Sequence, residues 1–244
     1  MQKSWIKKPR SSLSSLLFLL LIGLSIRSFL FEPFHIPSSS MKSTLLEGDY
    51  VITSKYSYGY SKHSFPFSPN IFNGRIFYTP PQRGDIIVFK PVKNNNIRFV
   101  KRVIGVPGDK VQVINGDLYL NNQKMPREQI ESFLDYELNI NILRYVETLS
   151  DGKKHEILID NTSHQLSHNT PAYYVPNDQF FVMGDNRNNS LDSRFSEIGF
   201  VPMENIIGRV RVVGLSFKLG KVVDWLPFRL PVALRLDRIL HKVA

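Results

Sequence analysis

The chain has 244 residues, and 42% of them are hydrophobic, which allows a folded domain with a buried core and argues against global disorder. It contains no cysteine, which excludes disulfide bonds, thiolate metal sites and a cysteine nucleophile. The formal net charge of +10 at pH 7 is compatible with nucleic acid or with an anionic membrane as a partner.

The first predicted element is an apolar segment over residues 13–31. Its one charged residue is Arg27, near the far end, and about 20 helical residues span the hydrocarbon core of a bilayer. Basic residues precede the segment, at Lys3, Lys7, Lys8 and Arg10. The pattern predicts a single-pass anchor, with residues 1–12 in the cytoplasm and the remainder across the membrane. A cleaved signal peptide is the alternative, but no small-x-small cleavage site follows before Pro33. Because most of the chain is predicted to lie on the far side of the membrane, nucleic acid is not expected as a partner.

Most later segments have the composition of β-strands. In chain order, the predicted strands cover residues 49–56, 86–89, 97–104, 110–114, 118–120, 179–183 and 206–217. Asn115-Gly116 between two of them predicts a hairpin with a type I′ turn. Residues 32–40, with two prolines, are expected to be extended or irregular, and residues 62–82 to form a loop. The predicted fold class is mainly β: an antiparallel-sheet core with an inserted β-rich lobe, preceded by a single N-terminal transmembrane helix.

We predict a β core from residues 32–111 and 178–218. Residues 112–177 form the inserted lobe in this interpretation; within them the stretch from residue 124 on is polar and irregular, with few turn signals. Residues 219–244 mix aromatic and aliphatic side chains with basic ones, which suits contact with a phospholipid surface. Packing of this segment on the domain is an equally good interpretation.

Lys101 is the most informative residue of the predicted strand 97–104. Because side chains alternate between the faces of a strand, it shares a face with apolar residues. These are Ile97, Phe99 and Val103. A desolvated lysine loses its proton more easily and can then act as a general base. The alternative is a lysine that extends along an apolar surface to water.

Three segments then stand out together, in this order: Ile36-Pro37-Ser38-Ser39-Ser40-Met41, Phe99 to Asp109 around Lys101, and Gly184-Asp185-Asn186-Arg187-Asn188-Asn189-Ser190-Leu191-Asp192-Ser193-Arg194. Behind an N-terminal anchor, this set resembles type I signal peptidase, the bacterial leader peptidase. Arg83-Gly84-Asp85-Ile86-Ile87-Val88-Phe89 matches a further motif of that family. The resemblance covers most of residues 34–217, with residues 112–178 poorly matched.

The resemblance implies a serine endopeptidase that removes signal peptides from exported preproteins, with no cofactor. It implies Ser40 as nucleophile and Lys101 as general base; the residues alone do not distinguish Ser40 from Ser38, Ser39 or Ser43. It further implies that the Ser40 N–H and the Ser38 hydroxyl stabilise the oxyanion, and that Ser190 orients the lysine. Asp192 is expected to pair with Arg102 and Arg194, a cluster that supports the site; an ordinary solvated pair is the alternative for Asp192 and Arg194. Desolvation should lower the pKa of Lys101 by about 2 units or more.

The family cuts after small residues at the −1 and −3 positions. The matching segments imply shallow pockets lined by Phe34, Ile36, Pro37, Met41, Leu45, Phe99 and Val100, for which plain core packing is the alternative. The implied location is the inner (cell) membrane, with the catalytic domain on the outer (periplasmic) side, next to phospholipid. Ser43 stands where the family commonly has proline, and Asn188 where an acid is frequent, which leaves the partner of Arg187 open.

Other functions fit the sequence less well. The histidines lack a Gly-x-Ser-x-Gly context or a zinc-protease motif, so neither a histidine triad nor a metal site is expected. A self-cleaving repressor with the same Ser/Lys chemistry would need a DNA-binding helical domain, and an anchor stands in its place. An anchored binding protein without activity would make Ser38 to Ser40 a flexible linker, but it does not account for the presence of Ser40, Lys101 and Ser190 together.

Overall fold

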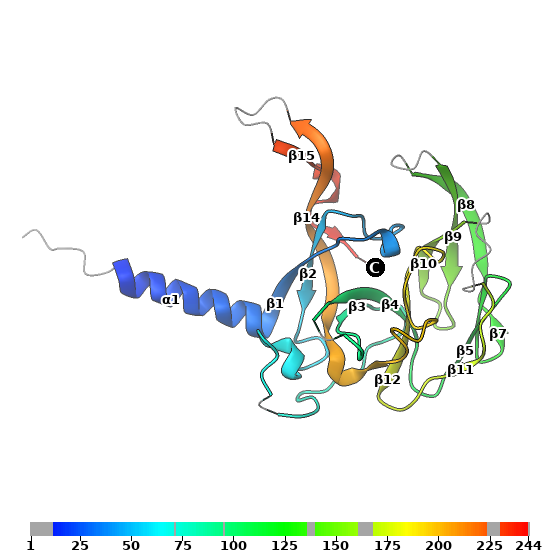
Figure 1. Cartoon of the computed structure of the whole chain (residues 1–244), viewed down its shortest axis with the longest axis horizontal. Coiled ribbons are helices and arrows are strands. Elements are labelled where there is room, and N and C mark those ends of the chain that lie inside the picture. The colour runs from blue at the N-terminus through cyan, green and yellow to red at the C-terminus, as the bar shows by residue number, and fades with distance from the viewer. Residues whose placement is uncertain are drawn as a thin grey trace, which may run out of the picture.

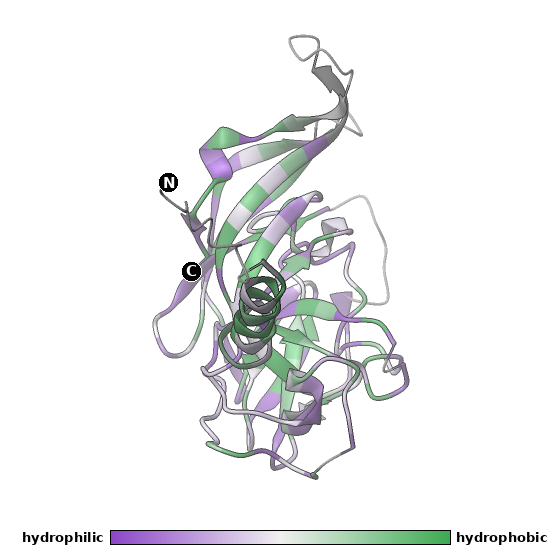
Figure 2. Ribbon diagram, turned by 90° about the vertical axis from the view of Figure 1, so that its left-hand side faces the viewer, coloured by the Kyte–Doolittle hydropathy of each residue, from purple (hydrophilic) through white to green (hydrophobic). Residues whose placement is uncertain are grey.

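The computed structural model describes residues 12–70, 72–94, 96–135, 140–160, 168–223 and 230–243. The N-terminal basic residues, His164, and Trp225, Phe228 and Arg229 of the C-terminal segment lie outside these ranges. Helix α1 (Ser12–Ser25) continues into a π-helical turn, η1 (Ile26–Leu30). It extends away from the β-sheets (Figure 1) and is apolar on all sides (Figure 2). Residues 13–30 are long and apolar enough to cross a membrane.

The largest sheet runs in the order β1-β2-β14-β3-β4-β12-β13, and β15 and β16 both pair with β14. Its strands are β1 (Phe31–His35), β2 (Asp49–Ser54), β3 (Ile86–Phe89), β4 (Phe99–Gly105), β12 (Gln179–Met183), β13 (Val201–Pro202), β14 (Ile206–Val223), β15 (Leu230–Leu234) and β16 (His241–Lys242). All the pairings are antiparallel. The prediction of a mainly β fold with an antiparallel core behind one apolar helix is therefore confirmed.

Two smaller sheets complete the β structure of the described residues. One has the order β11-β5-β6-β7 and the other β10-β9-β8. Their strands are β5 (Lys110–Ile114), β6 (Asp117–Leu120), β7 (Gln123–Lys124), β8 (Arg127–Asp135), β9 (Ile140–Thr148), β10 (Lys154–Ile159) and β11 (Tyr173–Tyr174). Short 3₁₀ turns lie at η2 (Ser39–Met41), η3 (Lys62–Ser64), η5 (Met203–Asn205) and η6 (Leu236–Arg238). Both small sheets lie on the side of the molecule away from α1 (Figure 1).

The predicted hairpin is present between β5 and β6. Asn115 has φ 52° and Gly116 has φ 80°, the positive values that a type I′ turn requires at both central residues. The expectation that the stretch from residue 124 on is irregular is wrong, because β8, β9 and β10 form regular antiparallel pairs there. In β8, exposed polar side chains such as Glu128, Gln129 and Glu131 interrupt the apolar ones, so composition hides this strand. The division into a core and an inserted lobe stays a prediction.

The hydrophobic core fixes the strands that carry the predicted site. One cluster joins β1, the segment after it, β2, β3 and β14, and includes Phe34, Ile36, Met41 and Leu45. A second cluster joins β3, β4, β12 and β14; it includes the buried Val103, and the partly buried Phe99 packs against it. Between them these clusters hold β1 and β4 on either side of the turn η2.

The described end of the C-terminal segment lies on the domain. Arg238 forms an ion pair with the buried Asp49, with Nη2 2.6 Å from Oδ2. Arg235 donates a hydrogen bond of 2.9 Å to the carbonyl of Glu47, and β16 pairs with β14. For residues 235–243 the packing interpretation is thus supported.

Candidate active site

A groove of about 300 Å³ is lined by β1, by the segment after it with part of η2, and by the start of β4. The residues that line it are Phe34, His35, Ile36, Pro37, Ser38, Ser40, Met41, Val88, Ile97, Arg98, Phe99, Val100 and Lys101. Six of the predicted pocket residues are among them. Leu45 is fully buried in the core cluster behind the groove.

Ser40 and Lys101 contact each other in this groove. Ser40 lies in η2, which begins after the extended residue Ser38, and Lys101 lies on β4 opposite Ile87 of β3. Lys101 Nζ is 2.5 Å from Ser40 Oγ, in a hydrogen bond that the amine donates. Ser39 instead accepts a hydrogen bond from Asn189, and Ser43 donates one to the carbonyl of Glu156. Of these three serines, Ser40 is the one in contact with the lysine.

Burial changes the proton affinity of Lys101. The residue is 2% exposed, and its Nζ lies 5.5 Å from the centre of the Phe99 ring. This desolvation lowers the pKa of Lys101 to about 8, although the carboxylates of Asp192 and Asp185 act in the opposite direction. A larger fraction of the amine is therefore neutral near pH 7 than for a solvated lysine.

Ser38 supplies a second hydroxyl group beside Ser40 and Lys101. Its Oγ lies 3.3 Å from Ser40 Oγ, and it lines the groove on the same side. A hydroxyl in this position is within reach of an oxygen that develops negative charge on a carbonyl attacked by Ser40.

The polar loop, residues 184–194, is organised by Asp192. This fully buried carboxylate accepts hydrogen bonds from the Gly184 N–H at 3.0 Å, from Ser190 Oγ at 2.7 Å and from Arg194 at 2.8 Å. Burial opposes its ionisation, but the charge of Arg194 outweighs burial, so the pKa of Asp192 is lowered. Within the described part of the chain, no hydrogen bond joins Ser190 to Lys101. The hydroxyl of Ser190 is held by Asp192.

Arg102 has a different partner from the one predicted. Its guanidinium forms two hydrogen bonds with Asp185, at 2.9 and 2.8 Å, whereas Asp192 forms its ion pair with Arg194. The structure thus brings Asp192 together with Arg194, and it brings Arg102 together with Asp185. Asp185 also accepts a hydrogen bond of 2.6 Å from Thr44, four residues after the serine. This ties β4, the polar loop and the turn together.

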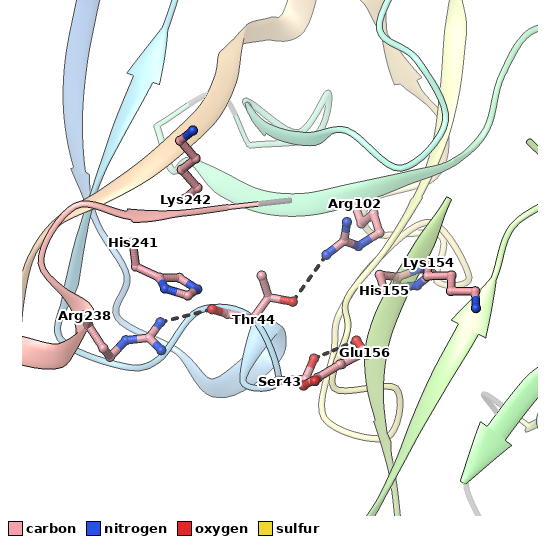
Figure 3. Close-up of a pocket in the computed structure, with 9 residues that line it drawn as sticks. All are labelled: Ser43, Thr44, Arg102, Lys154, His155, Glu156, Arg238, His241 and Lys242. Atoms are coloured by element: carbon pink, nitrogen blue, oxygen red, sulfur yellow. Dashed lines mark hydrogen bonds between the residues drawn. The ribbon is translucent and has the colours of Figure 1, made fainter. Parts of the chain in front are cut away.

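The turn that carries Ser40 is also held from the side away from the groove. A second cavity of about 270 Å³ lies there, behind Ser43 and Thr44 (Figure 3). The Thr44 carbonyl accepts a hydrogen bond of 3.0 Å from Arg238, and its hydroxyl accepts one of 3.3 Å from Arg102. Ser43 donates its hydrogen bond to β10 across the same cavity.

Sequence analysis missed an ion pair that joins β9 to the polar loop. Arg187 donates two hydrogen bonds to Glu147, one of them 3.0 Å long, and both residues are almost fully buried. Burial opposes ionisation of Glu147, but the charge of Arg187 outweighs burial and lowers its pKa. His155 is buried beside this pair, and burial lowers its pKa to about 4. Nothing in the sequence around Glu147 indicates that its partner is Arg187, 40 positions later in the chain.

In the described residues, no group of three or more histidine, aspartate or glutamate side chains is placed to hold a metal ion. The groups that converge on the groove are a hydroxyl nucleophile, an amine of lowered pKa and a further hydroxyl. This set can perform nucleophilic attack on a carbonyl with a general base.

The chain is similar to known signal peptidases. A family model described as "Signal peptidase, peptidase S26" matches residues 9–215. The chain is 41% identical over 221 residues to signal peptidase I of Rickettsia typhi, covering 87% of this chain and 83% of that one. It is 42% identical over 211 residues to signal peptidase I of Rickettsia akari, covering 83% and 78%. A crystal structure of a signal peptidase I from Enterococcus faecalis is 29% identical, with a TM-score of 0.32, and the match covers 54% of this chain and 97% of that one.

Proposed function

Since the chain belongs to the signal peptidase family, peptidase S26, and is a serine endopeptidase of the signal peptidase I type, we propose that it cuts preproteins with a Ser40/Lys101 dyad. The observation that carries this proposal is the contact of 2.5 Å between a buried lysine amine and one hydroxyl in the groove. A serine hydroxyl is a weak nucleophile until a base removes its proton.

In the proposed reaction, neutral Lys101 takes the proton of Ser40 as Oγ attacks the carbonyl of the −1 residue. The tetrahedral intermediate collapses to an acyl-enzyme, and the proton passes from Lys101 to the departing amine. A water then attacks the ester with Lys101 again as base, which releases the signal peptide and restores Ser40. The lowered pKa of Lys101, about 8, supports a base that works near neutral pH.

The oxyanion would be stabilised by the Ser40 N–H and the Ser38 hydroxyl. The distance of 3.3 Å between the two Oγ atoms supports this role for Ser38. Four further residues would support the reaction without touching the substrate, because they fix the polar loop and β4 around the dyad: Arg102, Ser190, Asp192 and Arg194.

The groove supports the proposed choice of small residues at −1 and −3. Among the described strands, β1 pairs only with β2, and β12 pairs with β4 only from Arg102 onward. A substrate in extended conformation can therefore hydrogen-bond to free strand edges that border the groove. Phe34, Met41 and Phe99 leave little room for large side chains between those edges.

We further propose that α1 anchors the enzyme in the inner (cell) membrane, with the N-terminus cytoplasmic and the catalytic domain periplasmic. The apolar segment 13–30 supports the anchor, and its direct continuation into β1 supports a groove that lies next to the bilayer. The preprotein and phospholipid are the partners in this proposal. Residues 32–111 and 178–218 would form the catalytic core, and residues 112–177 an inserted lobe.

The test is cleavage of a model preprotein with an Ala-x-Ala boundary by the full-length protein in detergent, with the cut located by mass spectrometry. We expect a single cut after the −1 alanine, and no cut when leucine replaces that alanine. Absence of cleavage by folded protein, or cleavage that ignores the leucine, would contradict the proposed activity and specificity.

A further inference from the structure

Arg98, the residue just before β4, is one of the residues that line the groove. Its guanidinium carbon lies 5.0 Å from the centre of the Phe34 ring, and its side chain remains 37% exposed. Arg98 lines the groove together with Val100, two residues further along the same face. A fixed positive charge therefore lies beside the space where a substrate would bind.

Arg98 is held in this position by Glu32 of β1. Arg98 Nη1 lies 3.2 Å from Glu32 Oε1, and Arg27 at the end of the apolar helix lies 3.3 Å from the same oxygen. The buried Lys55 occupies the other oxygen at 2.7 Å. Glu32 is thus shared by three basic side chains, and it is 4% exposed.

This sharing leaves positive charge in excess at the groove. Both guanidiniums stay charged in proteins, and together they outnumber the single carboxylate. Glu32 is saturated and buried, so it cannot also compensate a charged substrate side chain. Arg98, over a third exposed, can still interact with one.

The strand spacing tells which substrate residue meets Arg98. Side chains at −1, −3 and −5 of an extended substrate share one face and are about 6.6 Å apart. In chain order away from Ser40 and Lys101, the groove is lined by Ile36 and Phe34 on one side and by Val100 and Arg98 on the other. If −1 lies at Ser40 and −3 against Phe34 and Val100, the next side chain on that face is −5.

We propose that Arg98 is a specificity-determining residue that reads the −5 position of the preprotein, favouring an acidic residue over a neutral one and disfavouring lysine or arginine. This inference rests on the proposed function, because it takes Ser40 as the point of cleavage. A lysine or arginine of the substrate next to this partly exposed arginine lowers substrate binding, and an acidic residue raises it, each by about fivefold at low salt.

The test uses full-length protein in nonionic detergent and three preproteins that differ only in Asp, Gln or Lys at −5. Wild type should show kcat/KM falling in that order, with roughly a 25-fold span that shrinks in high salt. Arg98→Gln should remove the order, while Arg98→Lys should retain it. Arg144→Gln is the matched control, because Arg144 is also a partly exposed arginine paired with a glutamate, away from the groove.

Equal cleavage of the three preproteins by wild type, or an unchanged order in Arg98→Gln, would overturn the inference. So would a defect of Arg98→Gln that appears only when anionic phospholipid vesicles are added, since it would assign Arg98 to lipid. Failure to cut any of the three would count against the proposed function itself and is distinguishable from equal cleavage.

Discussion

Lys101 Nζ and Ser40 Oγ lie 2.5 Å apart although 61 positions separate them in the sequence. The contact depends on β4, whose register with β3 places Lys101 opposite Ile87, and on the turn η2 after β1. The apolar groove around both residues withholds water from the amine. The same contact therefore supplies both the geometry and the lowered pKa of a general base.

The first prediction concerns pH. Only the neutral amine can accept the proton of Ser40, so kcat/KM should rise with pH and level off above the pKa of Lys101, near 8. The measurement is kcat/KM for a model preprotein from pH 6 to 10. A profile already level at pH 6 would contradict Lys101 as the base at this pKa.

The second prediction concerns stability. Folding lowers the pKa of Lys101 from 10.5 to about 8, so the folded state binds the proton less tightly than the unfolded state does. Replacing the lysine by methionine should stabilise the protein by up to about 3 kcal/mol below pH 8. The gain should shrink as pH rises from 8 to 10.5, where wild type no longer carries a buried charge.

This is measured as thermal unfolding by circular dichroism at pH 6 and pH 10, for wild type and Lys101→Met. Lys93→Met, at an exposed position, is the control and should show no pH-dependent difference. If Lys101→Met were less stable than wild type at pH 6, the assigned cost of burying the charged amine would be wrong.

The third prediction concerns Gly184, at the start of the polar loop. A Cβ atom there would lie 2.5 Å from the carbonyl oxygen of Ser40, which is closer than real contacts allow. Gly184→Ala should displace the turn or the loop, lower kcat at least about 100-fold and cost about 1–3 kcal/mol. The same change at Gly23, whose Cβ would meet nothing within 4 Å, should leave cleavage unchanged. Near-normal activity of Gly184→Ala would refute the need for this close approach.

The fourth prediction concerns the buried pair of Glu147 and Arg187. Glu147→Gln should destabilise the protein by about 3–5 kcal/mol, because it leaves the charge of Arg187 buried without compensation. Lys124→Gln breaks an exposed ion pair with Asp117 and should cost at most about 1 kcal/mol. Equal thermal stability of the two variants would mean that the β9 contact does not hold the polar loop.

Much of the sheet could be predicted because its strands are short apolar runs between turn residues. The structure has strands over the predicted ranges of β3, β5 and β12, and Asn115-Gly116 fixed the hairpin. β1 was harder to predict because Pro33 argues against a strand, yet proline is tolerated at a sheet edge. β8 was missed because exposed polar side chains interrupt its few apolar ones, and β9 because Asn141, Arg144 and Glu147 stand among its apolar residues.

The site was only partly accessible to sequence reasoning. Strand alternation pointed to Lys101, but the choice of Ser40 among neighbouring serines depended on family resemblance. The contact of Arg102 with Asp185 could not be predicted, because Asp185 and Asp192 lie in one loop and only the fold of the loop determines which carboxylate faces β4. Glu147 comes from a different sheet, so no local pattern could have placed it beside Arg187.

The most direct measurement compares cleavage of one model preprotein by wild type, Ser40→Ala, Lys101→Ala and Ser39→Ala, all verified as folded. Ser39 is adjacent in the chain but hydrogen-bonds to Asn189. We predict that the first two variants lose cleavage and that Ser39→Ala retains it. Cleavage by Ser40→Ala or Lys101→Ala at a rate near that of wild type would contradict the dyad.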